Sequence, residues 1–198
     1  MLQPNLGTFI KYVNAPDRSR RSRAIDARVQ SESEYAIETD FWKRMRAAIV
    51  ADRKTTRDCA AVNEAAARAT EKKQASFSAV AANWPRICRR WEASTFVRPP
   101  SGIVTIGGLE VAVRPLFSEA LTTGLVEHAI VWMNRPEPSE SAVQGAMRLV
   151  TKLDPDPGCR AVFVDARRGR VWTGLAESLQ ENDSWLDGIG AAFLRDAA

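Results

Sequence analysis

The fold is decided by residues 103–173, which read IVTIGGLEVAVRPLFSEALTTGLVEHAIVWMNRPEPSESAVQGAMRLVTKLDPDPGCRAVFVDARRGRVWT. The start of this stretch predicts a β-hairpin, because the limbs 103–106 and 109–114 flank two glycines that can take the positive φ of a tight turn. Large apolar residues alternate with smaller or charged ones along the second limb, so one of its faces is expected to be buried. Residues 115–124 are expected to form a loop.

Three more strands and one helix complete the predicted core. Residues 125–133 end in a near-continuous apolar run, which is typical of a central strand covered on both faces. Residues 161–165 and 170–173 form two further strands around a turn. A helix over residues 139–153 has a serine N-cap and is stopped by the sequence DPDPG. We therefore predict an α/β (α+β) domain over residues 99–198, with a small mixed β-sheet of four to five strands flanked by helices.

Residues 1–98 are predicted to form a basic helical region that precedes this domain. Apolar spacing and breakers indicate helices at 6–13, 17–31, from Tyr35 or Asp40 to about 53, and 56–83. Pro85 makes residues 84–92 either a kinked continuation of the last helix or a separate short helix. Residues 94–102 contain two prolines and a glycine and are the best candidate for a linker.

The two halves differ in charge. Residues 1–98 carry 19 Lys/Arg against 11 Asp/Glu, a balance of +8, whereas residues 99–198 carry 9 against 13, a balance of −4. A basic helical half predicts contact with nucleic acid or with an acidic protein surface, or an electrostatic contact between the halves. The candidate nucleic-acid-binding residues are Arg18, Arg20, Arg21, Arg23, Arg86, Arg89 and Arg90.

Several function classes lack their signature. No apolar run approaches the roughly 18 residues that span a bilayer, and the N-terminus lacks a signal-peptide layout, so we expect a cytoplasmic protein with no membrane partner. Three widely spaced cysteines predict neither a disulfide framework nor a metal site. His128 is the single histidine, so a Cys/His or Ser/His/Asp arrangement must include it. Phosphate-binding loops and hydrolase elbows are absent, and no catalytic motif is intact.

The order of a helix, three strands, a helix and a strand resembles the core of the PD-(D/E)XK nuclease superfamily between Trp84 and Trp172. The resemblance is carried by Val113-Arg114-Pro115 and by residues 161–165, AVFVD. It implies that the α/β domain recruits the helix at 84–94. It also implies a site in which acids hold a hard divalent cation that activates water, and a lysine orients that water.

The sequence departs from the family pattern at the reactive positions. Leu116 stands where the first acid is expected, and Ala129 stands where the lysine belongs. The remaining weak catalytic candidates are Glu110, Glu127 and His128, and Mg²⁺ is expected only if they form a substitute site. Glu127 and His128 are adjacent on a strand and therefore point to opposite faces.

Three functions remain open from the sequence. The first is a non-catalytic binding or interaction protein that contacts nucleic acid through its basic helical region. The second is a divergent metal-dependent nuclease in which Glu110, Glu119 or Glu127 replaces the family's acids. The third is a structural subunit of a larger cytoplasmic assembly, because six tryptophans are many for this length and exposed ones would mark an interface.

Overall fold

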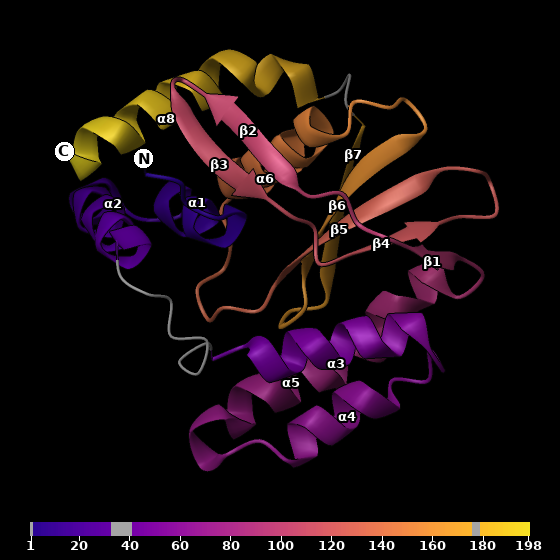
Figure 1. Ribbon diagram of the computed structural model, residues 1–198. Helices are drawn as coiled ribbons and strands as arrows, with labels where there is room; N and C mark the ends of the chain where they lie inside the picture. The colour runs from indigo at the N-terminus through magenta and orange to yellow at the C-terminus, as the bar shows by residue number, and fades with distance from the viewer. Residues whose placement is uncertain (1, 33–40, 176–178) are drawn as a thin grey trace.

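A five-stranded mixed sheet forms the centre of the computed structural model, which describes residues 2–32, 41–175 and 179–198 (Figure 1). The strands, in spatial order, are β1 (Thr95–Val97), β4 (Phe117–Ala120), β5 (Val126–Trp132), β6 (Cys159–Asp165) and β7 (Arg170–Leu175). β5 and β6 are parallel, and the other neighbouring pairs are antiparallel. The predicted α+β class with a mixed sheet is confirmed.

Helix α6 (Glu140–Leu153) makes the connection that the parallel pair β5 and β6 requires. Its N-terminus is capped by Ser139, whose hydroxyl accepts a hydrogen bond from the amide of Ala142 at 3.2 Å. Asp154 ends the helix and precedes Pro155, which disfavours further helix. The predicted helix and its boundaries are confirmed.

The hairpin β2 (Gly102–Ile106) and β3 (Leu109–Val113) forms where the sequence predicts it, but it is a separate two-stranded sheet. The second strand of the main sheet is instead β4, within the segment that we expected to be a loop. β4 shows no apolar alternation, because its residues Ser118 and Glu119 are polar. Both are nevertheless buried, since residues distant in the sequence form hydrogen bonds with them. A sequence pattern therefore could not mark it.

One layer of the molecule covers the α6 face of the sheet. It contains α1 (Leu6–Val13), α2 (Asp17–Glu32), the β2–β3 hairpin and α8 (Asp183–Ala197), which follows the short turn η3 (Gln180–Asn182) (Figure 1). α2 contributes Ala24 and Ala27 to this core and packs on α8. The larger apolar residues of this helix, Ile25 and Val29, point away from the core and are 42% and 57% exposed.

The opposite face is covered by α3 (Lys43–Lys54), α4 (Ala60–Ala67) and α5 (Glu71–Cys88), which η2 (Arg89–Trp91) extends. The prediction of a single helix over residues 56–83 is wrong, because the helix is interrupted between α4 and α5. The break lets Val62 and Val80 meet in one core. The start predicted for α3, at Tyr35 or Asp40, lies outside the residues that the structure describes. α5 continues through Pro85, which agrees with the first of the two alternatives predicted for residues 84–92.

Helices from the first 98 residues therefore lie on both faces of the sheet. Four tryptophans are buried and Trp172 and Trp185 are partly buried, so these rings fill the interior. All three cysteines are buried and free, with the sulfurs of Cys59 and Cys88 3.4 Å apart. Among the described helices, none combines the length and apolar character needed to cross a membrane.

Candidate functional site

A large groove is lined by residues of α1 and of α3. Figure 1 shows these two helices in different helical layers of the molecule. The segment after β1, the end of β3 and the end of β5 also line it, together with Ser76 of α5 and Arg167 between β6 and β7. Its volume is about 1690 Å³. Typical small-molecule sites are roughly 300–1,000 Å³, so this groove is of a size that suits a polymer segment.

The lining of the groove is strongly basic. Its cationic side chains are Lys11, Arg46, Lys54, Arg98, Arg114, Arg135 and Arg167. No aspartate or glutamate lines it within the part of the chain that the structure describes. Five of the seven are exposed, and Arg46 and Arg167 are half-buried. A concave surface with one sign of charge concentrates the electrostatic field and attracts polyanions.

The pKa of Lys11 is lowered, in part by this concentration of positive charge. Although the residue is exposed, surrounding protein atoms partly desolvate its ammonium and lower its pKa, and the nearby positive charges of Arg23 and Arg46 lower it further. Arg23 belongs to α2 and Arg46 to α3, so cations from both layers act on the same point. Charge repulsion of this kind is relieved when an anion binds.

Two aromatic rings line the groove and are only partly buried. Phe41 and Phe96 come from opposite ends of the α3 side, and lysines lie over both, with Lys54 Nζ 5.1 Å from the Phe96 centroid and Lys73 Nζ 5.2 Å from the Phe41 centroid. Trp42 also lines the groove but is 8% exposed, and its indole donates to the side-chain oxygen of Asn134. Phe41 and Phe96 are therefore more exposed than Trp42.

The predicted arginines on α2 are exposed or half-buried. Arg20 forms an ion pair with Asp17 at 2.9 Å on its own helix. Arg23 is the member of this cluster that acts on Lys11 in the groove. The structure thus connects one residue of the predicted cluster with the basic groove.

The predicted arginines at the end of α5 have mainly structural contacts. Arg86 donates to the carbonyl of Gly169 at 2.9 Å, which secures the turn between β6 and β7. Arg90 makes a two-pronged contact with the carboxylate of Glu127 at 2.8 and 2.6 Å. Arg89 is exposed. The guanidinium groups of Arg86 and Arg90 are therefore engaged with the protein itself.

Glu127 lies fully buried on the α5 side of the sheet. Its carboxylate accepts hydrogen bonds from Arg90, from Arg160 at 2.6 Å and from the indole of Trp91 at 2.6 Å. Burial by itself raises the pKa of Glu127, but the bonds from Arg90 and Arg160 outweigh it and the net pKa shift is downward. The carboxylate is thus kept charged and forms ion pairs with two arginines.

Glu119 is also fully buried and faces the same side. Arg53 donates to it at 2.8 Å, Arg57 at 3.0 Å and the Ser94 hydroxyl at 2.7 Å. A magnesium ion would need these oxygens as its ligands, and guanidinium groups already occupy them. Glu110 lies on the separate hairpin, where its side chain accepts from Gln3. These acids do not fit a Mg²⁺ site.

His128 lies on the opposite face of β5 from Glu127, as the alternation of the strand predicts. Its Nδ1 is 2.7 Å from the Ser118 hydroxyl and its Nε2 is 3.0 Å from the Asp154 carboxylate. Burial lowers the pKa of His128, against the raising influence of Asp154. This is a Ser-His-Asp chain, but Ser118 is 0% exposed and forms its inner end, so a substrate cannot reach the hydroxyl. The arrangement does not fit nucleophilic catalysis.

The sequence matches no protein-family model and no curated protein. The groove and the side-chain clusters are therefore the features that bear on function. Sequence inspection missed the groove because its cations are spread from Lys11 to Arg167 and form no local cluster. Three of the seven, Arg114, Arg135 and Arg167, come from the half of the chain with net negative charge.

Proposed function

We propose that this protein binds single-stranded nucleic acid, without cleaving it, through the basic groove between α1 and α3. The observation that carries the proposal is the lining of the groove, which has seven Lys/Arg and no Asp/Glu among the described residues. Phosphates supply the negative charge that such a lining favours, and contacts with phosphates provide most of the non-specific affinity of nucleic-acid-binding proteins.

The choice of a single strand depends on the aromatic rings. Phe41 and Phe96 are partly buried and line the same groove as the cations. Unpaired bases stack on such rings while the backbone follows the positive charge, and this stacking is sequence-tolerant. A duplex keeps its bases stacked internally and would use only the cations. The groove therefore favours single strands over duplexes.

Binding without cleavage follows from the same lining. The described lining residues include no carboxylate and no histidine, so they offer no ligands for a hard cation and no general base. The two buried glutamates behind the sheet are held by arginines. The groove is thus equipped to hold a strand but not to hydrolyse it.

The test is a fluorescence anisotropy titration of labelled single-stranded DNA and RNA, with a duplex of the same sequence for comparison. Two triple variants carry the same charge change. The groove variant is Arg98→Glu, Arg114→Glu and Arg135→Glu, and the matched control is Arg18→Glu, Arg21→Glu and Arg89→Glu, all six positions being exposed. The control also tests arginines that the sequence predicted.

We expect the groove variant to lose at least tenfold in affinity and the control variant to lose clearly less. With about four phosphate contacts, a salt slope near −0.7 per contact predicts a fall of roughly 50-fold between about 0.05 and 0.2 M salt. Equal losses in the two variants would show that the groove is not the site. Tighter binding of the duplex would contradict the single-strand proposal, and Mg²⁺-dependent cleavage would contradict the absence of catalysis.

A further inference from the structure

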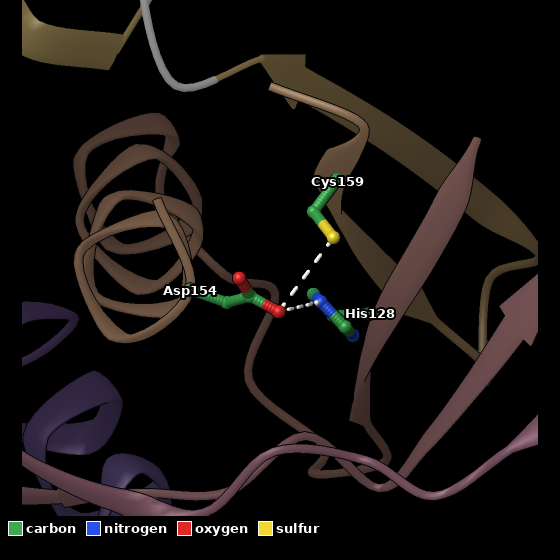
Figure 2. A group of neighbouring side chains, drawn as sticks. All are labelled: His128, Asp154 and Cys159. Carbon is green, nitrogen blue, oxygen red and sulfur yellow. Dashed lines mark hydrogen bonds and ion pairs between the residues drawn. The ribbon is translucent and has the colours of Figure 1, made fainter. Parts of the chain in front are cut away.

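We propose that His128, Asp154 and Cys159 form a binding site for a zinc-like divalent metal ion. The three side chains converge where β5, the end of α6 and the start of β6 meet (Figure 2). This site lies on the opposite face of β5 from the buried glutamates, and none of its residues lines the basic groove. It is therefore independent of the proposed nucleic-acid binding.

Two of the three donor-atom spacings are close to those of a tetrahedral centre. The Asp154 Oδ2 atom is 3.0 Å from His128 Nε2 and 3.6 Å from Cys159 Sγ, and the three ligand atoms lie within 4.8 Å of one another. Zinc binds nitrogen and oxygen at about 2.0–2.2 Å and sulfur at about 2.3 Å, which places tetrahedral neighbours roughly 3.3–3.6 Å apart. Small side-chain adjustments therefore suffice to bring all three atoms onto one ion.

The backbone fixes the three positions independently of any ion. Val126 pairs with Cys159 and His128 pairs with Ala161 across the parallel strands, so His128 and Cys159 are diagonal neighbours on one face. Asp154 directly follows α6, in a turn where Asp156 accepts from the amide of Gly158 at 2.7 Å. A site supported by two strands and a capped turn is largely preorganised.

Ser118 supplies the second contact that a metal-binding histidine needs. Metal-ligating imidazoles usually donate their other ring N–H to a fixed partner, which sets the tautomer and the ring orientation. The Ser118 hydroxyl is 2.7 Å from Nδ1, and a hydroxyl can accept from Nδ1–H as well as donate to a bare Nδ1. Figure 2 shows Nε2 facing the Asp154 carboxylate, and with the proton on Nδ1 the Nε2 lone pair becomes available to a metal ion.

The donor set selects the class of metal. A thiolate with an imidazole and one carboxylate suits zinc and related transition-metal ions, and it disfavours Mg²⁺ and Ca²⁺, which prefer oxygen. On coordination the Cys159 thiol releases its proton to solvent, and a sulfur–metal bond forms. The Asp154 side chain is 30% exposed, so the fourth ligand position opens to water on its side.

The test is a titration of the full-length, reduced and metal-free chain with Co²⁺, whose bond to a thiolate gives a charge-transfer absorption in the near ultraviolet. We expect one equivalent of Co²⁺ to bind with this band and Zn²⁺ to remove it by displacement. Cys159→Ser should lose the band. The matched control, Cys59→Ala with Cys88→Ala, removes the thiols of the other core cluster and should keep it.

Two further variants keep the test decisive if Cys159→Ser does not fold. Ser118→Ala should retain the band but weaken binding about 10- to 100-fold, as loss of a histidine-orienting contact does. Asp154→Asn, at a partly exposed position, should also weaken binding. The proposal is overturned if the folded wild type shows no sulfur–cobalt band, if the band survives in Cys159→Ser, or if Asp154→Asn binds as tightly as wild type.

Discussion

Glu119 and Glu127 lie directly opposite each other on the antiparallel strands β4 and β5, and both side chains are 0% exposed. Two buried carboxylates in register would repel each other strongly in a low-dielectric interior. Four arginines offset this repulsion: Arg53 and Arg57 on Glu119, and Arg90 and Arg160 on Glu127. The network also joins α3, the turn after α5 and the sheet.

Removal of one arginine from this network should destabilise the protein strongly. Arg53 is 1% exposed, so Arg53→Met leaves Glu119 buried with fewer partners, and breaking such a pair costs about 3–5 kcal/mol. Urea unfolding monitored by tryptophan fluorescence measures the loss. The double variant Arg53→Met with Glu119→Gln should recover part of it, because the uncompensated charge is gone.

The matched control for this prediction is Arg68→Met. Arg68 pairs with Glu64 on the surface, at 69% and 56% exposure, and exposed pairs contribute about 0–1 kcal/mol. Similar losses for Arg53→Met and Arg68→Met would mean that the buried network is not a major source of stability. A double variant no more stable than Arg53→Met would contradict the charge argument.

Asp183 should contribute to an acid-sensitive part of the stability. Its hydrogen bonds from Arg148, at 2.7 Å to each oxygen, lower its pKa to about 2, with a further contribution from Lys152. An unfolded aspartate has a pKa of about 3.9, so Asp183 is protonated at a lower pH in the folded chain than in the unfolded chain. This contribution is therefore complete above about pH 4 and is lost as the pH falls through about 2.

The substitution Asp183→Asn should flatten the dependence of unfolding free energy on pH between about 4 and 2. Because the side chain is 37% exposed, the effect should be smaller than a full conversion of the pKa shift. Urea midpoints measured across this pH range test it, with Asp26→Asn, at an exposed position of α2, as the control. An unchanged acid dependence in Asp183→Asn would contradict the assignment.

Gly190 and Gly188 provide an internal pair for testing how α8 packs. A Cβ added to Gly190 would lie 2.1 Å from the Ile106 carbonyl oxygen, whereas one added to Gly188 would meet nothing within 4 Å. Gly190→Ala should therefore push α8 away from the hairpin and cost about 1–3 kcal/mol.

Gly188→Ala should instead stabilise the protein by up to about 1 kcal/mol, because alanine has the higher helix propensity. Thermal melts of the two variants test the sign of each change. Equal stability of Gly190→Ala and Gly188→Ala would contradict the close packing of α8 on the hairpin at Ile106.

Local pattern predicted much of the secondary structure. α1, α6, β3, β5 and β6 appear where periodicity and capping residues place them. Each of these elements carries its own signal, because one face is buried and the neighbouring residues stop it. β4 has no such signal: Ser118 and Glu119 are polar, and their burial depends on His128, Arg53 and Ser94 elsewhere in the chain.

The sequence by itself determined the α+β class, the crossover helix α6, the opposite faces of Glu127 and His128, and the lack of a local catalytic motif. Only the tertiary structure decided which arginines face a groove and which hold buried acids, because those contacts join distant residues. Arg53 and Glu119 are 66 positions apart, and His128 and Asp154 are 26 apart. Hydrophobic periodicity reports only which face of a local element is buried, so the groove and the His128, Asp154 and Cys159 cluster appear only when the chain is folded.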